Sequence, residues 1–218
     1  MSNRQGAVIF KGDSMLDGWV RRRIDPGLRA MARKLAAWGV SANMVTWCGW
    51  AIGMAAAGAI AGGWLWTGLA LLLASRLADG LDGAVAAIRG KTGYGGYLDI
   101  VLDFIFYGAI PLAFAMLDPQ ANALAAAALL FTFYANGASF LAYAVLAERH
   151  AMETTARGEK SLYFTTGLAE ATETIAVFVA MCLFPAWFAV IAWCFAAVCL
   201  YTAAMRILLA RRTFAARR

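Results

Sequence analysis

Long apolar stretches recur along this sequence from about Met44 to Leu209. Each covers about eighteen residues or more, which is enough for a helix to cross the roughly 30 Å hydrocarbon core of a bilayer. Hydrophobic residues make up 62% of the 218-residue chain and charged residues only 15%, far from the balance of a soluble domain. The pattern predicts an all-α, polytopic membrane protein.

Turn residues interrupt the apolar sequence and predict six transmembrane helices. Three connections contain Gly62-Gly63, Asp118-Pro119 or Phe184-Pro185 and have no lysine or arginine, whereas nearly all positive charges lie at the other helix ends. By the positive-inside rule we expect both termini in the cytoplasm, which requires an even number of spans. The expected spans cover about residues 44–62, 65–88, 95–117, 121–147, 161–183 and 186–209.

Basic residues concentrate before the first span. Residues 14–37 place apolar side chains at roughly helical spacing among arginines and lysines, which predicts an interfacial amphipathic helix on anionic headgroups. We therefore divide the chain into a cytoplasmic N-terminal segment (1–40), a six-helix transmembrane domain (41–210) and a basic cytoplasmic tail (211–218). Membrane lipids are the expected partners of the charge, because no nucleic-acid-binding module is recognisable.

Four aspartates occur near the cytoplasmic ends of the second and third expected spans. Asp79 and Asp82 share one helix face, and so do Asp99 and Asp103. A short loop joins the two helices as an antiparallel hairpin, so the four carboxylates must meet. Each costs about 2.5 to 3.5 kcal/mol inside a membrane, and like charges repel. A pair of divalent cations would offset both costs, and we predict that all four aspartates bind metal.

The aspartates allow two other interpretations. Arg76 lies one turn before Asp79, so the group could be a buried ion-pair cluster without chemistry. Against this, ionisable residues within membranes are usually functional. A cation transporter or channel would spread acidic residues across the membrane or break its helices at the middle, whereas these aspartates cluster at one end. His150 is the only histidine, which excludes a multi-histidine metal site.

The stretch from Asp79 to Asp103 resembles the signature of the CDP-alcohol phosphotransferase family, D-x-x-D-G-x-x-A-R followed after a short gap by G-x-x-x-D-x-x-x-D. Ala42 to Thr46 also resembles the P-N-x-x-T sequence that opens the first span in the family. The resemblance covers residues of about 40–210 and supports six helices with cytoplasmic termini.

Two positions depart from the family pattern. Ala87 stands where the pattern has arginine, and Ala42 where it has proline. The first departure removes a phosphate or headgroup contact, for which Arg89 or Arg76 could substitute. All four aspartates are present, so the metal site is unaffected.

The resemblance implies a phospholipid-biosynthesis enzyme of the bacterial inner membrane, with its active site facing the cytoplasm. A phosphatidyl group would move from CDP-diacylglycerol to the hydroxyl of a small polar acceptor and release CMP, with two divalent cations, Mg²⁺ or Mn²⁺, and a homodimer as the expected assembly. The alternatives are transfer of a CDP-alcohol headgroup to diacylglycerol and a non-catalytic relative that binds metal or lipid.

Roles follow for individual residues. Asp103 is our candidate for the base that takes the acceptor proton, with metal ligation as its alternative role. The family pattern implies that Gly83 and Ala86 let the cytidine lie close to the helix. Asn43 and Thr46 either cap the first span, which is the simpler role, or contact phosphate. The predicted nucleotide- and phosphate-binding residues are Asn43, Thr46, Asp79, Gly83, Ala86, Arg89 and Gly95.

Two sets of charged residues compete for the acceptor. Glu170 and Glu173 share a face of the fifth span and suit sugar hydroxyls or an amine, unless they pair with an arginine such as Arg76 or with neighbouring hydroxyls. Arg157 and Lys160 suit a phosphorylated acceptor. The sequence leaves the acceptor open.

Overall fold

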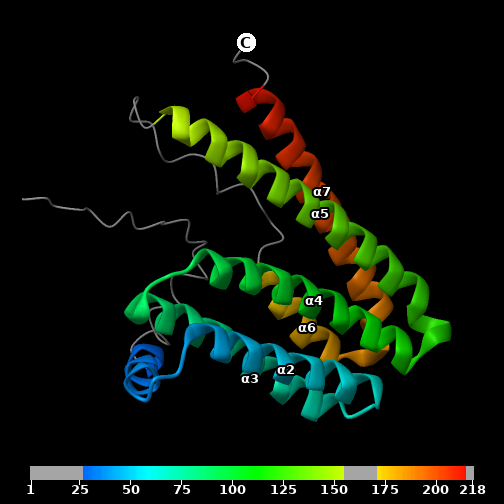
Figure 1. Cartoon of the computed structure of the whole chain (residues 1–218). Coiled ribbons are helices and arrows are strands. Elements are labelled where there is room, and N and C mark those ends of the chain that lie inside the picture. The colour runs from blue at the N-terminus through cyan, green and yellow to red at the C-terminus, as the bar shows by residue number, and fades with distance from the viewer. Residues whose placement is uncertain (1–26, 155–170, 215–218) are drawn as a thin grey trace, which may run out of the picture.

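All regular structure in the described residues is helical (Figure 1). The computed structural model describes residues 27–154 and 171–214, so residues 14–26 of the expected amphipathic helix, and Arg157, Lys160 and Glu170, lie outside the described residues. A helix over residues 27–37 comes first, and we call it helix 27–37. The elements that follow are α2 (Ala42–Ala61), α3 (Leu65–Arg89), α4 (Gly93–Leu117), α5 (Pro119–Thr154), α6 (Ala171–Leu183), a 3-10 turn (Pro185–Trp187) and α7 (Phe188–Phe214).

Four segments are long and apolar enough to cross a membrane: α2, α4, residues 119–148 of α5, and the 3-10 turn with α7. α3 is not among them, because Arg76, Asp79 and Asp82 lie along it. α6 is apolar, but its described part has 13 residues. The bounds of α2, α3 and α4 agree with the expected spans to within two residues at each end, and the all-α prediction is confirmed.

Capping residues set where α2 begins, where α3 ends and where α4 begins. Ser41 accepts a hydrogen bond from the backbone N–H of Met44 (3.2 Å) and starts α2. Gly90 ends α3 with φ at +102°, a conformation that L side chains rarely adopt. Thr92 then caps α4 by accepting from the backbone N–H of Gly95 (3.0 Å). The turn between α3 and α4 is therefore short, and the two helix ends lie together.

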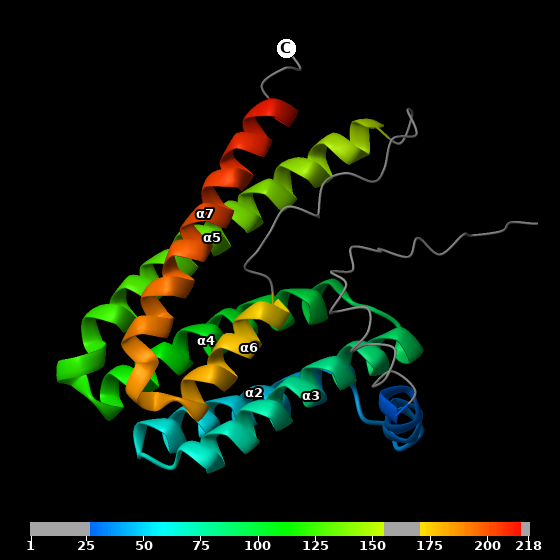
Figure 2. The same ribbon diagram turned by 180° about the vertical axis from the view of Figure 1, so that it is seen from behind.

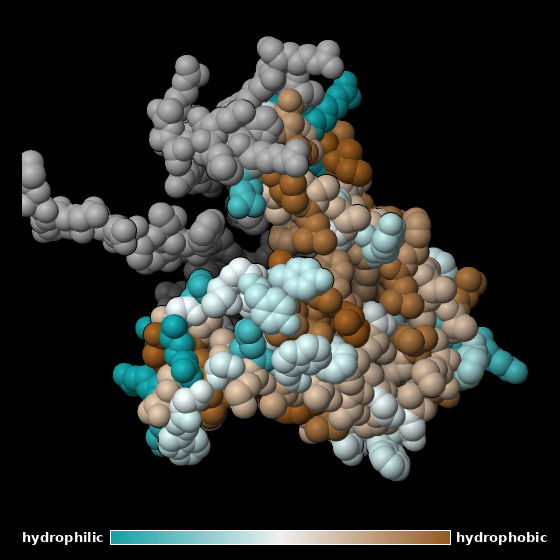
Figure 3. Space-filling model, in the orientation of Figure 1, coloured by the Kyte–Doolittle hydropathy of each residue, from teal (hydrophilic) through white to brown (hydrophobic). Residues whose placement is uncertain are grey.

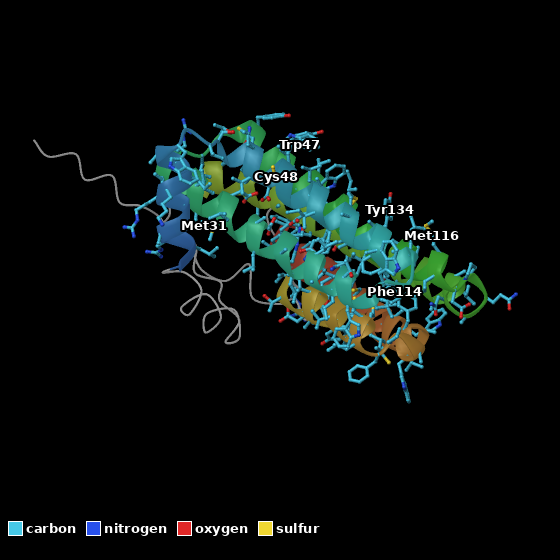
Figure 4. The ribbon with its side chains drawn as sticks, turned by 90° about the horizontal axis from the view of Figure 1, so that it is seen from below. Met31, Trp47, Cys48, Phe114, Met116 and Tyr134 are labelled. Carbon is cyan, nitrogen blue, oxygen red and sulfur yellow. The ribbon has the colours of Figure 1, made fainter. Side chains whose placement is uncertain are left out.

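The helices form two groups. α2 packs against both α3 and α4, with α6 behind α4, whereas α5 and α7 pair with each other and rise away from the rest (Figures 1 and 2). A buried apolar core joins the groups, and in it the rings of Phe114 and Phe188 stack 4.6 Å apart. Figure 4 shows Phe114 within the bundle and Trp47, Met116 and Tyr134 on its outer surface.

Two glycines let α2 approach its neighbours closely. A Cβ on Gly53 would lie 2.7 Å from the Phe106 ring of α4 and 2.8 Å from Ser75 Oγ of α3. A Cβ on Gly49 would lie 3.0 Å from Ala78 Cβ. Small residues at helix interfaces allow such close backbone packing in membrane proteins. The backbone of α2 therefore lies beside the aspartate-bearing hairpin.

Helix 27–37 crosses the ends of α2 and α3 (Figures 1 and 4). Its Ala32 is fully buried in a small apolar cluster with Leu81 and Val85 of α3. Hydrophilic residues gather at this end of the molecule, whereas apolar residues cover most of the helix lengths (Figure 3). The aspartate pairs of α3 and α4 lie toward this polar end.

Candidate functional site

Three of the four predicted aspartates come together between α3 and α4. Asp79, Asp99 and Asp103 each offer a carboxylate oxygen, and these three oxygens lie within 4.8 Å of one another. All three side chains are half-buried. Asp82 lies outside this group and is 7% exposed. Its Oδ2 atom is buried and has no hydrogen-bond partner in the described part of the chain.

Arg76 lies among these carboxylates. Its Nη1 donates to Asp103 Oδ1 at 2.7 Å and lies 3.7 Å from Asp79 Oδ2. Its Nη2 donates to Ser75 Oγ at 3.1 Å, and the Ser75 hydroxyl donates to the carbonyl of Gly49. The guanidinium also lies 4.0 Å from the centre of the Phe106 ring, within the range of a cation–π interaction. Contacts from α3 and α4 therefore fix the orientation of Arg76, and Ser75 links the group to the backbone of α2.

A hollow opens beside this cluster. Leu102, a buried residue of α4, forms part of its apolar wall. The carboxylate oxygens are hard ligands of the kind that Mg²⁺ and Mn²⁺ prefer. Asp82, whose Oδ2 has no partner among the described residues, follows Asp79 by three residues on α3. The residues present therefore fit divalent metal. The lining residues are Thr46, Gly49 and Trp50 of α2, Ser75, Arg76 and Asp79 of α3, and Asp99, Leu102 and Asp103 of α4.

The residues predicted at the start of the first span lie inside α2. Ser41 is the cap, so the interpretation of Asn43 and Thr46 as capping residues was wrong; they follow the helix start by one and four residues. Thr46 is buried, lines the hollow and donates its hydroxyl to the Ala42 carbonyl at 3.0 Å. Asn43 lies beside Gly95, where a Cβ would come within 3.1 Å of Asn43 Oδ1.

Gly83, Ala86 and Arg89 lie on the last turns of α3. Gly83 is exposed, and a Cβ there would meet nothing within 4 Å, so this side of the helix is open. Ala86 is half-buried. Arg89 is exposed and donates to the carbonyl of Val40 at 2.9 Å, outside the hollow. Of the two arginines considered as substitutes for the motif arginine, the structure places Arg76 on the hollow.

Glu173 lies in the first turn of α6, and its Oε2 atom is buried without a partner among the described residues. Arg76 pairs with Asp103 and Asp79, and the described chain shows no ion pair between Arg76 and Glu173.

Sequence reasoning missed two residues. Trp50 lines the hollow four residues after Thr46, and that spacing was the available signal. Arg206 of α7 lies outside every motif. Its Nη1 donates to the Asn136 carbonyl (3.1 Å), to Asn136 Oδ1 (2.8 Å) and to Ser139 Oγ (2.8 Å), which joins α7 to α5.

Two proteins of known sequence resemble this chain. It is 46% identical over 193 residues to the inner membrane protein YnjF of Escherichia coli K12, covering 88% of this chain and 94% of that protein. It is 41% identical over 102 residues to the archaetidylinositol phosphate synthase of Methanothermobacter thermautotrophicus, covering 45% of this chain and 49% of that protein.

Crystal structures of the Mycobacterium tuberculosis phosphatidylinositol phosphate synthase PgsA1 share the fold. The form with CDP-DAG bound has a TM-score of 0.63 at 23% identity, covering 83% of this chain and 91% of that one. The complex with manganese and citrate also has a TM-score of 0.63, at 24% identity, covering 83% and 87%.

The family model for CDP-alcohol phosphatidyltransferases matches residues 39–203, a range that includes α2, the aspartate hairpin of α3 and α4, and most of α7. The chain also has several helices that can cross a membrane. It is an integral membrane protein and belongs to the CDP-alcohol phosphatidyltransferase family of enzymes.

Proposed function

We propose that this protein moves a phosphatidyl group from CDP-diacylglycerol to the hydroxyl of a small polar acceptor and releases CMP. The observation that carries the proposal is the convergence of Asp79, Asp99 and Asp103 on one hollow. Membership in the family supports the donor class, and so does the related fold of PgsA1 with CDP-DAG bound.

Four carboxylates would hold two divalent cations, Mg²⁺ or Mn²⁺: those of Asp79, Asp82, Asp99 and Asp103. The bound cations would offset the charge that develops on the pyrophosphate during transfer. The donor chemistry of the site supports this assignment, as does the manganese in a PgsA1 structure of related fold. Asp82 would join the other three through its unpartnered Oδ2.

Asp103 is the group we assign as general base. Arg76 binds its Oδ1, so the second oxygen is the one that would accept the acceptor proton. The acceptor oxygen then bonds to the phosphorus that carries diacylglycerol, the bond from this phosphorus to CMP breaks, and CMP leaves. Arg76 orients the base and supplies positive charge beside the site.

The cytidine would lie against the open side of α3, next to Gly83 and Ala86. Asn43 and Gly95, which lie together, and Thr46 on the hollow would complete the nucleotide and phosphate contacts. Arg89 is not part of this proposal, because its guanidinium contacts Val40.

A phosphorylated polyol is the acceptor class that we propose. Arg206 places a guanidinium between α5 and α7, where it would attract a phosphate group. The archaetidylinositol phosphate synthase that resembles this chain supports the same class. Glu173, with its unpartnered buried oxygen, would accept hydrogen bonds from polyol hydroxyls.

The membrane arrangement is also part of the proposal. Six helices would span the bacterial inner membrane, with α3 and the expected span over residues 161–183 joining the four apolar spans, and both termini and the hollow would face the cytoplasm. The similarity to an inner membrane protein of E. coli supports this location. Helix 27–37 would lie in the interface as part of the N-terminal segment, and two copies would form a homodimer.

Purified protein in liposomes provides the test. CDP-diacylglycerol and Mn²⁺ are combined with one acceptor at a time (inositol phosphate, glycerol 3-phosphate, inositol or serine), and the lipid product is identified by mass spectrometry. We expect one acceptor to give a new phospholipid and CMP in equal amounts. Product from CDP-choline and diacylglycerol instead would establish headgroup transfer, and metal binding without any turnover would establish a non-catalytic relative.

A further inference from the structure

Trp50 has an unused hydrogen-bond donor beside the proposed active site. The residue lines the same hollow as Asp79 and Asp103. Its indole Nε1 atom is buried and has no acceptor among the residues that the structure describes. Leaving a buried polar group without a partner destabilises the protein, because the group gives up its hydrogen bonds to water. An acceptor that is not part of the protein would remove this cost.

The indole ring is fixed in position by its surroundings. Trp47 packs its ring edge-on against Trp50, with the ring centres 5.5 Å apart and the planes at 89°. The preceding residue, Gly49, lies against Ala78 of α3, and its carbonyl accepts from Ser75. Helix packing at Gly49 and the ring contact with Trp47 therefore fix the place of the indole beside the hollow.

Trp50 lies at the deeper end of the hollow. It follows Ala42, the first residue of α2, by eight residues, or about 12 Å along the helix. Thr46, which also lines the hollow, is one turn closer to the helix start. The open side of Gly83, where we place the cytidine, lies four residues beyond Asp79 toward the end of α3. The indole is therefore placed for the lipid-linked part of the donor.

We infer that the indole N–H of Trp50 donates a hydrogen bond to an oxygen of the phosphate that carries diacylglycerol in CDP-diacylglycerol. This inference rests on the proposed function for the identity of the donor. Arg76 supports it, because its Nε is a second buried donor without a partner and it lines the same hollow. The N–H groups of Trp50 and Arg76 would together hold the lipid-linked phosphate. The nucleotide would bind nearer the start of α2 and the end of α3.

Binding without turnover tests this role. Dissociation constants for CDP-diacylglycerol and for CMP are measured in Mn²⁺ without acceptor, on wild-type protein and on Trp50→Phe. Trp47→Phe is the matched control, since it keeps an aromatic ring packed against Trp50 and changes a residue that does not line the hollow. Benzothienylalanine at position 50 is a second variant, because it keeps the shape of the indole and replaces only its N–H with sulfur.

We expect both changes at position 50 to weaken CDP-diacylglycerol binding about tenfold to a hundredfold, the scale of a lost hydrogen bond to a charged group, and to leave CMP binding unchanged. Trp47→Phe should change neither. Unchanged affinity for CDP-diacylglycerol with benzothienylalanine would overturn the inference, and so would equal weakening of CMP binding. Because no acceptor is present, the outcome is independent of whether the protein catalyses transfer.

Discussion

Arg76 and the aspartates form the tightest group of charges in the site. The Arg76 side chain is 10% exposed and that of Asp103 27%, so water screens their 2.7 Å contact only weakly. Removing one member of such a pair leaves the other without compensation, which commonly costs about 3 to 5 kcal/mol. Bound divalent cations would provide a second source of positive charge for the same carboxylates.

Arg76→Gln should therefore destabilise the metal-free protein more than the metal-bound one. In chelator we expect the free energy of unfolding to fall by about 3 kcal/mol or more, at the scale of such pairs, which lowers the unfolding temperature in detergent by several degrees. Mn²⁺ should largely restore both. Arg89→Gln, which loses only a contact to a backbone carbonyl, is the control. An equal loss with and without Mn²⁺ would show that the carboxylates do not share a metal.

At the residue scale, the sequence predicted that four aspartates meet, of which the structure brings three together, and it did not predict Trp50. The aspartates share faces of two helices joined by a short turn, and this spacing is visible in the sequence. Trp50 lies on the face of α2 that meets α3 and α4, and this face is set by close packing at Gly49 and Gly53. The helix is apolar on all sides, so hydrophobic periodicity in the sequence does not show which face is packed.

Helix α2 shows what the sequence predicts about elements. Its bounds follow from the length of the apolar stretch, but its cap was misplaced, because Ser41, Asn43 and Thr46 all carry side chains that can cap a helix. Its close packing against α3 and α4 depends on Gly53, and the sequence does not distinguish this glycine from Gly58 on the same helix.

Alanine at these two glycines should have opposite effects. Gly53→Ala places a methyl group against Phe106 and Ser75, and we expect it to cost about 1 to 3 kcal/mol of stability and to lower CMP release. Gly58→Ala is exposed with nothing within 4 Å of the new Cβ, so it should be neutral or stabilise by up to about 1 kcal/mol. Thermal unfolding measures both. Equal stabilities would show that α2 does not pack this closely.

At the scale of the whole molecule, two groups of charged and polar side chains stand out among the described residues. The aspartates lie between α3 and α4, whereas Arg206 connects α7 to Asn136 and Ser139 of α5. The family motif predicts the first group and has no residue in the second, which exists only because two helices distant in sequence pair along their length. A separate acceptor site would use this second group.

Arg206→Gln tests whether the acceptor binds at Arg206, apart from the aspartates. We expect it to raise KM for a phosphorylated acceptor about tenfold or more, since it removes a charged partner of the phosphate, and to leave CDP-diacylglycerol binding unchanged. Arg211→Gln changes an exposed arginine on the same helix and should have no effect. If Arg206→Gln weakened the donor and the acceptor alike, the arginine would serve the structure of the bundle instead.

Metal-dependent release of CMP from CDP-diacylglycerol tests the central claim most directly. Wild-type protein and Asp103→Asn are compared in liposomes containing an active acceptor, with Mn²⁺ or with chelator. We expect CMP and new phospholipid in equal amounts from wild-type protein in Mn²⁺, and at least a hundredfold less from Asp103→Asn or in chelator, at the scale of a lost general base. CMP release that survives both chelator and Asp103→Asn would contradict the assignment of this carboxylate site as the centre of the reaction.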